Sequence, residues 1–149
     1  MIVVDTSVWI AALRDGHGVE ARILGRLLDA DEVALPVVVR IEMLAGASRR
    51  DLPPLRKALS ALPLVYPADE TWRLIDSWID RATRAGQRFG SGDLLIAALA
   101  HGIGALVWSL DADFARMGRI GMIGLYDPPA GAGERTRRPP KPRSKPAGR

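Results

Sequence analysis

The chain has 149 residues, of which 48% are hydrophobic and 26% charged, enough apolar side chains for one domain with its own core. The absence of cysteine excludes disulfides, thiolate zinc sites, iron–sulfur clusters and thiol nucleophiles. We expect a soluble, cytoplasmic protein that does not enter a membrane. The first residues lack the basic segment of a signal peptide, and the longest uncharged apolar stretch, 94–107, is too short to span a bilayer.

The net charge of +4 is concentrated near the C-terminus. Residues 134–149 contain seven of the 21 lysines and arginines and one acid, whereas the preceding 133 residues carry 14 basic and 16 acidic side chains. From position 128 onward the chain also has six of its 11 prolines and no apolar periodicity. The sequence therefore predicts a folded domain over residues 1–126 and a basic, proline-rich, disordered tail over 127–149.

Short apolar segments alternate with segments of helical periodicity along the first 126 residues. Because each apolar segment is short and lacks charges, the pattern predicts a parallel sheet covered by helices on both faces. The segment 109–116 is expected to be a loop with a short helical turn. The expected strands are 2–4, 33–35, 64–66, 105–108 and 122–125, and the expected helices are 7–14, 19–30, 37–48, 55–61, 69–85 and 93–101.

Five acidic residues follow expected strands or lie on the helices beside them. Asp5 ends the first strand, Asp93 begins a helix, and Asp111 and Asp113 follow the fourth strand, while Glu42 lies on the helix after the second strand. Ligands of parallel sheets bind at the carboxyl ends of the strands, which makes this set a candidate site.

The candidate site is built from carboxylates alone. The chain has only two histidines, no phosphate-binding glycine loop and no Ser-His-Asp set. Oxygen ligands without His or Cys select Mg²⁺ or Mn²⁺, and such a cation offsets the repulsion between crowded carboxylates. Divalent ions also serve phosphodiester hydrolysis, by activating water and stabilising the leaving oxygen. Taken singly, the same acids have simpler explanations as helix caps, turn residues or solvated side chains.

Four segments carry a resemblance to a known family: IVVDTSVWIAAL, RIEMLAG, GDLLIAALA and VWSLDADFARM. In order and approximate spacing they resemble the PIN-domain ribonucleases, in particular the VapC toxins of bacterial toxin–antitoxin pairs, over residues 1 to about 126. The resemblance implies a three-layer α/β/α sandwich with a central parallel sheet of about five strands. It also implies endonucleolytic cleavage of RNA that depends on Mg²⁺ or Mn²⁺.

The resemblance further assigns roles to individual acids. It implies that Asp5, Glu42, Asp93 and Asp111 are catalytic, and that Asp5, Asp93 and Asp111 bind metal, with Asp5 and Asp93 the firmest ligands. Asp113 acts through water or takes the place of Asp111. The family usually has Thr where this chain has Ser109, so a hydroxyl remains there to orient a carboxylate, as Ser7 can do for Asp5. The implied partners are an RNA substrate, a VapB-type antitoxin that covers the acidic pocket, and a second copy of the chain in a homodimer.

Other classes of protein fit these residues less well. A haloacid-dehalogenase-type phosphatase requires a second Asp at position 7, which is Ser7, and an integrin-like metal site requires Ser at position 9, which is Trp9. A receiver domain requires a lysine near the site, and the chain has lysines only at 57, 141 and 145. The strongest non-catalytic alternative is an inactive PIN module that binds RNA or a protein partner.

The basic tail is not explained by the resemblance. We hypothesise that it adds non-specific RNA affinity through phosphate contacts, because it carries a charge of +6 beside a domain of charge −2. An effect on solubility alone is an equal alternative. Unchanged RNA affinity and salt dependence after deletion of residues 128–149 would contradict the hypothesis.

Overall fold

Four parallel strands form the centre of the protein, which the computed structural model describes over residues 1–129. They pair in the order β3-β2-β1-β4. Every residue of β1 and β2 is buried, because helices cover both faces of the sheet and continuous apolar segments suit that position. The strands are β1 (Ile2–Val4), β2 (Val33–Pro36), β3 (Leu64–Val65) and β4 (Leu106–Trp108).

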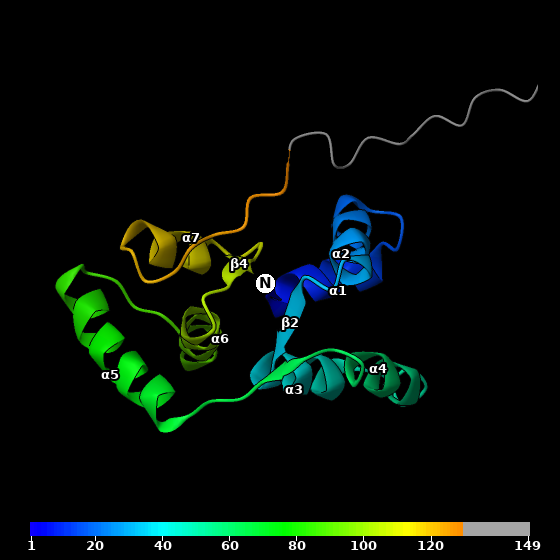
Figure 1. Ribbon diagram of the computed structural model, residues 1–149, viewed down its shortest axis with the longest axis horizontal. Helices are drawn as coiled ribbons and strands as arrows, with labels where there is room; N and C mark the ends of the chain where they lie inside the picture. The colour runs from blue at the N-terminus through cyan, green and yellow to red at the C-terminus, as the bar shows by residue number, and fades with distance from the viewer. Residues whose placement is uncertain (130–149) are drawn as a thin grey trace, which may run out of the picture.

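Seven helices in the described part of the chain surround this sheet. The chain moves outward from β1 to β3 and then returns to the other side of β1, so right-handed crossovers place the later helices on the opposite face. Figure 1 shows α5, α6 and α7 on one side of the strands, and the earlier helices on the other. The helices are α1 (Thr6–Arg14), α2 (Val19–Asp29), α3 (Val37–Gly46), α4 (Leu52–Leu59), α5 (Asp69–Arg84), α6 (Ser91–Gly102) and α7 (Ala112–Arg119).

The predicted α/β sandwich with a parallel sheet is confirmed, with a smaller contribution from the last expected strand. The segment 122–125 forms a single parallel bridge, between Val107 and Leu125, beside β4. Two backbone hydrogen bonds hold it, from Val107 N–H to the Gly124 carbonyl (2.9 Å) and from Tyr126 N–H to the Val107 carbonyl (2.8 Å). A Cβ atom on Gly124 would lie 2.7 Å from a terminal methyl of Leu106, so any larger residue there would require this exposed side chain to move.

Helix α7 occupies most of the segment 109–116, where the sequence predicts a loop with a short helical turn. Its buried face consists of Phe114 and Met117, which are spaced by one helical turn and are 1% and 0% exposed. The carboxylate of Asp111 caps the helix by accepting a hydrogen bond from Asp113 N–H. The expected helical turn is therefore a longer helix of 8 residues, and the signal for its length is an acidic cap followed by two apolar residues three positions apart.

The two tryptophans of α5 have different environments. Trp78 is buried in the core and makes an edge-to-face contact with His101, with ring centroids 5.5 Å apart. Trp72 is 52% exposed. Trp78 therefore stabilises the domain itself, and the expected homodimer remains a prediction.

None of the helices in residues 1–129 has the length and apolar character that a membrane span requires. The predicted tail, except for residues 127–129, lies outside the described residues.

Candidate metal centre

The pairing of β1 with β4 positions the first acid of the site. Val4 is in register with Trp108, so the next residues, Asp5 and Ser109, are neighbours at the carboxyl edge of the sheet. Asp5 N–H donates to the Trp108 carbonyl at 2.9 Å, and the Asp5 residue is only 5% exposed. The structure thus places a carboxylate at the buried end of the central strand, where an unpartnered charge would be costly.

Two serine hydroxyls partly satisfy this carboxylate. Ser7 Oγ and Ser109 Oγ donate to Asp5 Oδ2 at 2.6 and 2.8 Å, and Ser7 N–H caps α1 on the same oxygen at 3.3 Å. The hydroxyls in turn accept hydrogen bonds from the backbone N–H groups of Leu110 and Asp111, each at 3.0 Å. No hydrogen bond reaches Asp5 Oδ1 from the described residues. Asp5 therefore acts as a helix cap through one oxygen, and its other oxygen accepts no hydrogen bond from the described residues.

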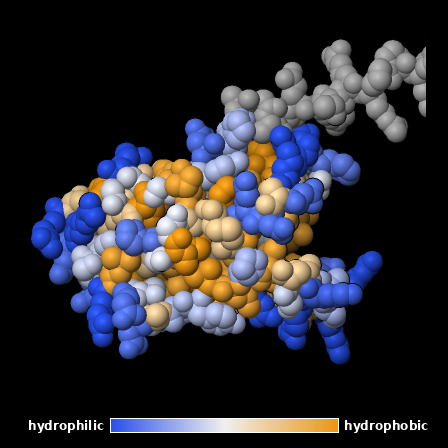
Figure 2. All heavy atoms as spheres, viewed as in Figure 1, coloured by the Kyte–Doolittle hydropathy of each residue, from blue (hydrophilic) through white to orange (hydrophobic). Residues whose placement is uncertain are grey.

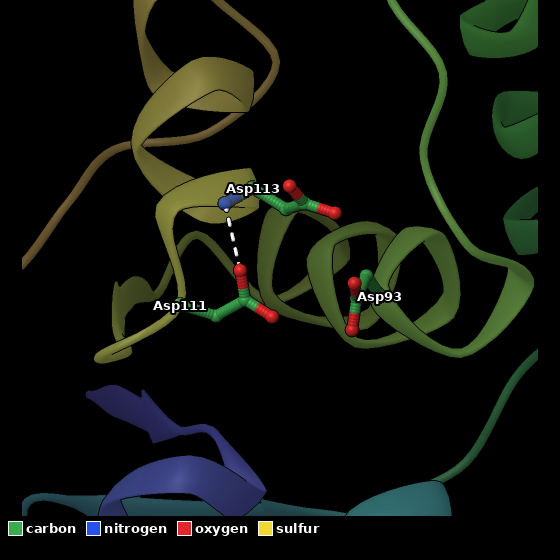
Figure 3. Close-up of side chains that lie close together, drawn as sticks. All are labelled: Asp93, Asp111 and Asp113. Carbon is green, nitrogen blue, oxygen red and sulfur yellow. Dashed lines mark hydrogen bonds between the residues drawn. The ribbon is translucent and has the colours of Figure 1, made fainter.

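Three other carboxylates converge at the starts of α6 and α7. Asp93, Asp111 and Asp113 each offer an oxygen within 4.8 Å of the others, and Figure 3 shows Asp93 on the first turns of α6 facing the two acids of α7. Asp113 N–H donates to Asp111 Oδ1 at 2.9 Å. Both helices direct their N-terminal dipole ends toward the carboxylates, which partly offsets the repulsion between the charges.

Glu42 approaches from α3 without joining these three acids. The Thr6 hydroxyl donates to Glu42 Oε2, and Glu42 Oε1 would lie 3.4 Å from a Cβ atom on Gly92. The glycine thus leaves room for the glutamate beside the first turn of α6. Glu42 is exposed, as expected for a side chain at the rim of a site.

Partial burial and neighbouring negative charges raise the pKa of Asp93 to about 6, from 3.8. Partial burial is the largest cause, followed by the negative charges of Asp111, Asp5, Asp113 and Glu42. All five predicted acids are therefore close enough to interact, although only Asp93, Asp111 and Asp113 have oxygens within 4.8 Å of one another. This donor set fits a hard divalent cation, because it consists of carboxylates that repel one another and includes no His or Cys.

Sequence analysis missed one residue at this site. Arg116 forms an ion pair with Asp113, and its side chain is 33% exposed. The sequence signal for this contact is the i,i+3 spacing of an acid and an arginine on one helix.

The whole folded region matches a known family. Residues 2–120 correspond to the PIN domain, and the chain therefore belongs to the PIN-domain family.

Individual proteins similar to this chain include curated ribonucleases and solved toxin–antitoxin structures. The chain is 34% identical over 125 residues to ribonuclease VapC11 of Mycobacterium tuberculosis and to VapC ribonuclease Mb1587 of Mycobacterium bovis, with coverage of 80% of this chain and 93% of each relative. A DNA-bound VapBC structure from Salmonella typhimurium has a TM-score of 0.70 and 20% identity, covering 85% of this chain and 96% of that one. VapBC2 of Rickettsia felis, bound to a promoter DNA fragment, has a TM-score of 0.67 and 18% identity, covering 85% and 98%. These two structures share the fold.

The raised pKa of Asp93 predicts an unusual pH dependence of stability. The folded state holds this proton more tightly than the unfolded chain, so without divalent ions stability should fall as pH rises from about 4 through 6. Asp93→Asn should remove this fall and raise the free energy of unfolding at pH 7.5 by about 1 kcal/mol, a figure reduced for solvent screening. Urea unfolding in EDTA measures both effects. Asp76→Asn, an exposed acid on α5, is the control, and equal pH profiles for all three proteins would contradict the prediction.

The network around Asp5 gives a second prediction. Ser109→Ala removes a hydroxyl that donates to Asp5 and accepts from Asp111 N–H, so we expect a loss of about 1–3 kcal/mol in the free energy of unfolding. Ser109→Thr keeps the hydroxyl and should remain close to the original protein. Equal losses for the two variants would show that packing, and not the hydroxyl, matters at this position.

Proposed function

We propose that this protein is a metal-dependent endoribonuclease, the toxin of a VapBC-type toxin–antitoxin pair. The observation that carries the proposal is the convergence of Asp93, Asp111 and Asp113 beside Asp5 at the carboxyl edge of a PIN-domain sheet. Relatives at 34% identity are named as VapC ribonucleases, which supports RNA as the substrate.

We assign four of the acids to cation binding and the fifth, Glu42 at the rim of the site, to a separate role. Asp93, Asp111 and Asp113 would hold Mg²⁺ or Mn²⁺, together with the Asp5 oxygen that accepts no hydrogen bond from the described residues. When bound, the cation supplies Lewis-acid activation of water and offsets charge that develops on the phosphate. Ser7 and Ser109 would orient Asp5 by donating to its other oxygen.

Glu42 is the candidate for proton transfer from the attacking water. It lies outside the group of three acids, and the Thr6 hydroxyl holds one of its oxygens. Neither histidine is a candidate: His17 neighbours the start of α2, and His101 at the end of α6 has its Nδ1 3.2 Å from the Met122 carbonyl oxygen. A carboxylate is therefore the side chain that we propose as the proton acceptor, and water would attack phosphorus in line with the leaving oxygen.

Cleavage of a mixed pool of structured RNA tests this proposal. We expect discrete cuts in Mg²⁺ or Mn²⁺, none in EDTA, and a loss of about a hundredfold or more in Asp5→Asn and Asp93→Asn. Asp76 is an exposed acid in the middle of α5 and is not one of the five acids of the site. The Asp76→Asn variant should therefore cleave RNA like the original protein.

Two other outcomes of the cleavage experiment would contradict the proposed nuclease activity. Cleavage that persists in EDTA or in both variants would indicate a contaminating nuclease. RNA binding that requires the metal, without cleavage, would favour the inactive PIN module.

We also propose that a VapB-type antitoxin docks in the groove beside the acidic site. A hollow of about 720 Å³ lies between α1, α3 and α4, is lined mainly by apolar side chains including Ile10, Leu13 and Met43, and reaches Glu42. Figure 2 shows apolar residues across the middle of this view of the molecule. Ile10 and Leu13 are 47% and 63% exposed, which leaves apolar surface for a partner to cover. A matching segment would carry apolar side chains for the groove and a basic one for the acids.

A charge placed in the groove should weaken this complex. Leu13→Asp is expected to reduce co-purification with a co-expressed VapB-type antitoxin, because docking would bury the new carboxylate. Ile79→Asp, at a similarly exposed position on α5, is the matched control. Retention of the antitoxin by Leu13→Asp, or its loss from both variants, would exclude this groove as the specific docking site.

A further inference from the structure

Arg116 makes three separate contacts from α7. One guanidinium nitrogen pairs with Asp113 Oδ1, and another donates to Gln87 Oε1 at 2.6 Å. The guanidinium carbon also lies 5.2 Å from the centroid of the Phe89 ring, within the range of a cation–π contact. A side chain held by three partners in this way has little freedom to move.

These contacts join the two segments that carry the three converging acids. Gln87 and Phe89 lie between α5 and α6, a few residues before Asp93, whereas Asp113 lies on the first turn of α7. The backbone of Gln87 is held in place, since its backbone N–H donates to the Ala82 carbonyl at 2.8 Å, and Phe89 packs against the core. Arg116 therefore links the segment that precedes α6 to the first turn of α7, close to the place where the carboxylates of Asp93 and Asp113 converge.

The charge of Arg116 is also distinctive within residues 1–129. Two ion pairs occur there, Arg116–Asp113 and Arg73–Glu70, and only the first includes one of the five acids. Both pairs have the same i,i+3 spacing, but Arg73 and Glu70 are 74% and 79% exposed and lie on α5. The surface pair thus provides a natural comparison for the one at the site.

We propose that Arg116 is a positioning residue that holds Asp113 against Asp93 for cation binding. The inference rests on the metal centre of the proposed function. The proposed role requires the planar guanidinium, because two of its nitrogens contact Asp113 and Gln87 at the same time. A lysine ammonium is a single point charge on a flexible side chain and cannot reproduce this geometry. Residues that orient metal ligands commonly change metal affinity by 10–100-fold when they are removed.

Mn²⁺ affinity of the full chain, measured by titration calorimetry, tests the proposal. We expect Arg116→Gln and Arg116→Lys each to weaken Mn²⁺ binding about tenfold, Gln87→Ala to weaken it less, and Arg73→Gln to leave it unchanged. In the double variant Arg116→Gln/Gln87→Ala, the losses should be less than additive, because both changes break the same bridge. Thermal unfolding without metal confirms that each variant is folded, and Gln87→Ala tests the bridge if Arg116→Gln fails to fold.

Three results would overturn the proposal. Unchanged or tighter Mn²⁺ binding by Arg116→Gln would show that the arginine does not help to build the site. Full recovery in Arg116→Lys would show that charge alone matters. Additive losses in the double variant would show that Gln87 and Arg116 act separately.

RNA cleavage separates this inference from the function on which it rests. In Arg116→Gln, saturating Mn²⁺ should restore most of kcat while the KM for RNA stays unchanged, since the defect lies in metal binding. A wild-type protein that binds Mn²⁺ through Asp93 but cuts no RNA would contradict the nuclease, and the affinities would still decide the role of Arg116. A wild-type protein that binds no Mn²⁺ would overturn both.

Discussion

The parallel pairing of β1 with β4 is the constraint on which the acidic edge depends. Its register places Asp5 beside Ser109, and it brings the starts of α1 and α7 to the same end of the sheet. The first turn of α6 also reaches this end, through the contact of Asp93 with the acids of α7. Three helix N-termini therefore face one cluster of carboxylates, and their dipoles make that cluster tolerable.

This arrangement concentrates negative charge at one edge of the sheet, at a cost in stability. Partial burial and the four neighbouring carboxylates raise the pKa of Asp93, so the folded protein carries an electrostatic cost at neutral pH in the absence of a cation. The protein reduces the cost with neutral hydroxyls at Asp5 and with a single arginine at Asp113. Complete neutralisation by more basic residues would improve stability but would also remove the attraction for a divalent ion.

The sequence was sufficient for the fold class and for the five acids, because continuous apolar strands and acids at their ends are local signals. It ranked Asp5 and Asp93 as the firmest ligands and Asp113 as a substitute, whereas the structure groups Asp113 with Asp93 and Asp111. That grouping depends on α7, which is too short for clear periodicity and for which the sequence predicts only a short helical turn within a loop. The bridge from Arg116 to Gln87 joins residues 29 apart, a contact that no local pattern encodes.

The distance in sequence between Asp5 and Ser109 has a consequence for biosynthesis. These two residues are 104 positions apart, yet their hydrogen bond lies at the centre of the site. The central strand leaves the ribosome early and has to wait for β4 before it can pair on that side, and such long-range pairing is slow. A growing chain thus has no complete acidic cluster until Asp113 has been added. The molecule gains its acidic edge late in translation, when nearly all of the described domain has already been made.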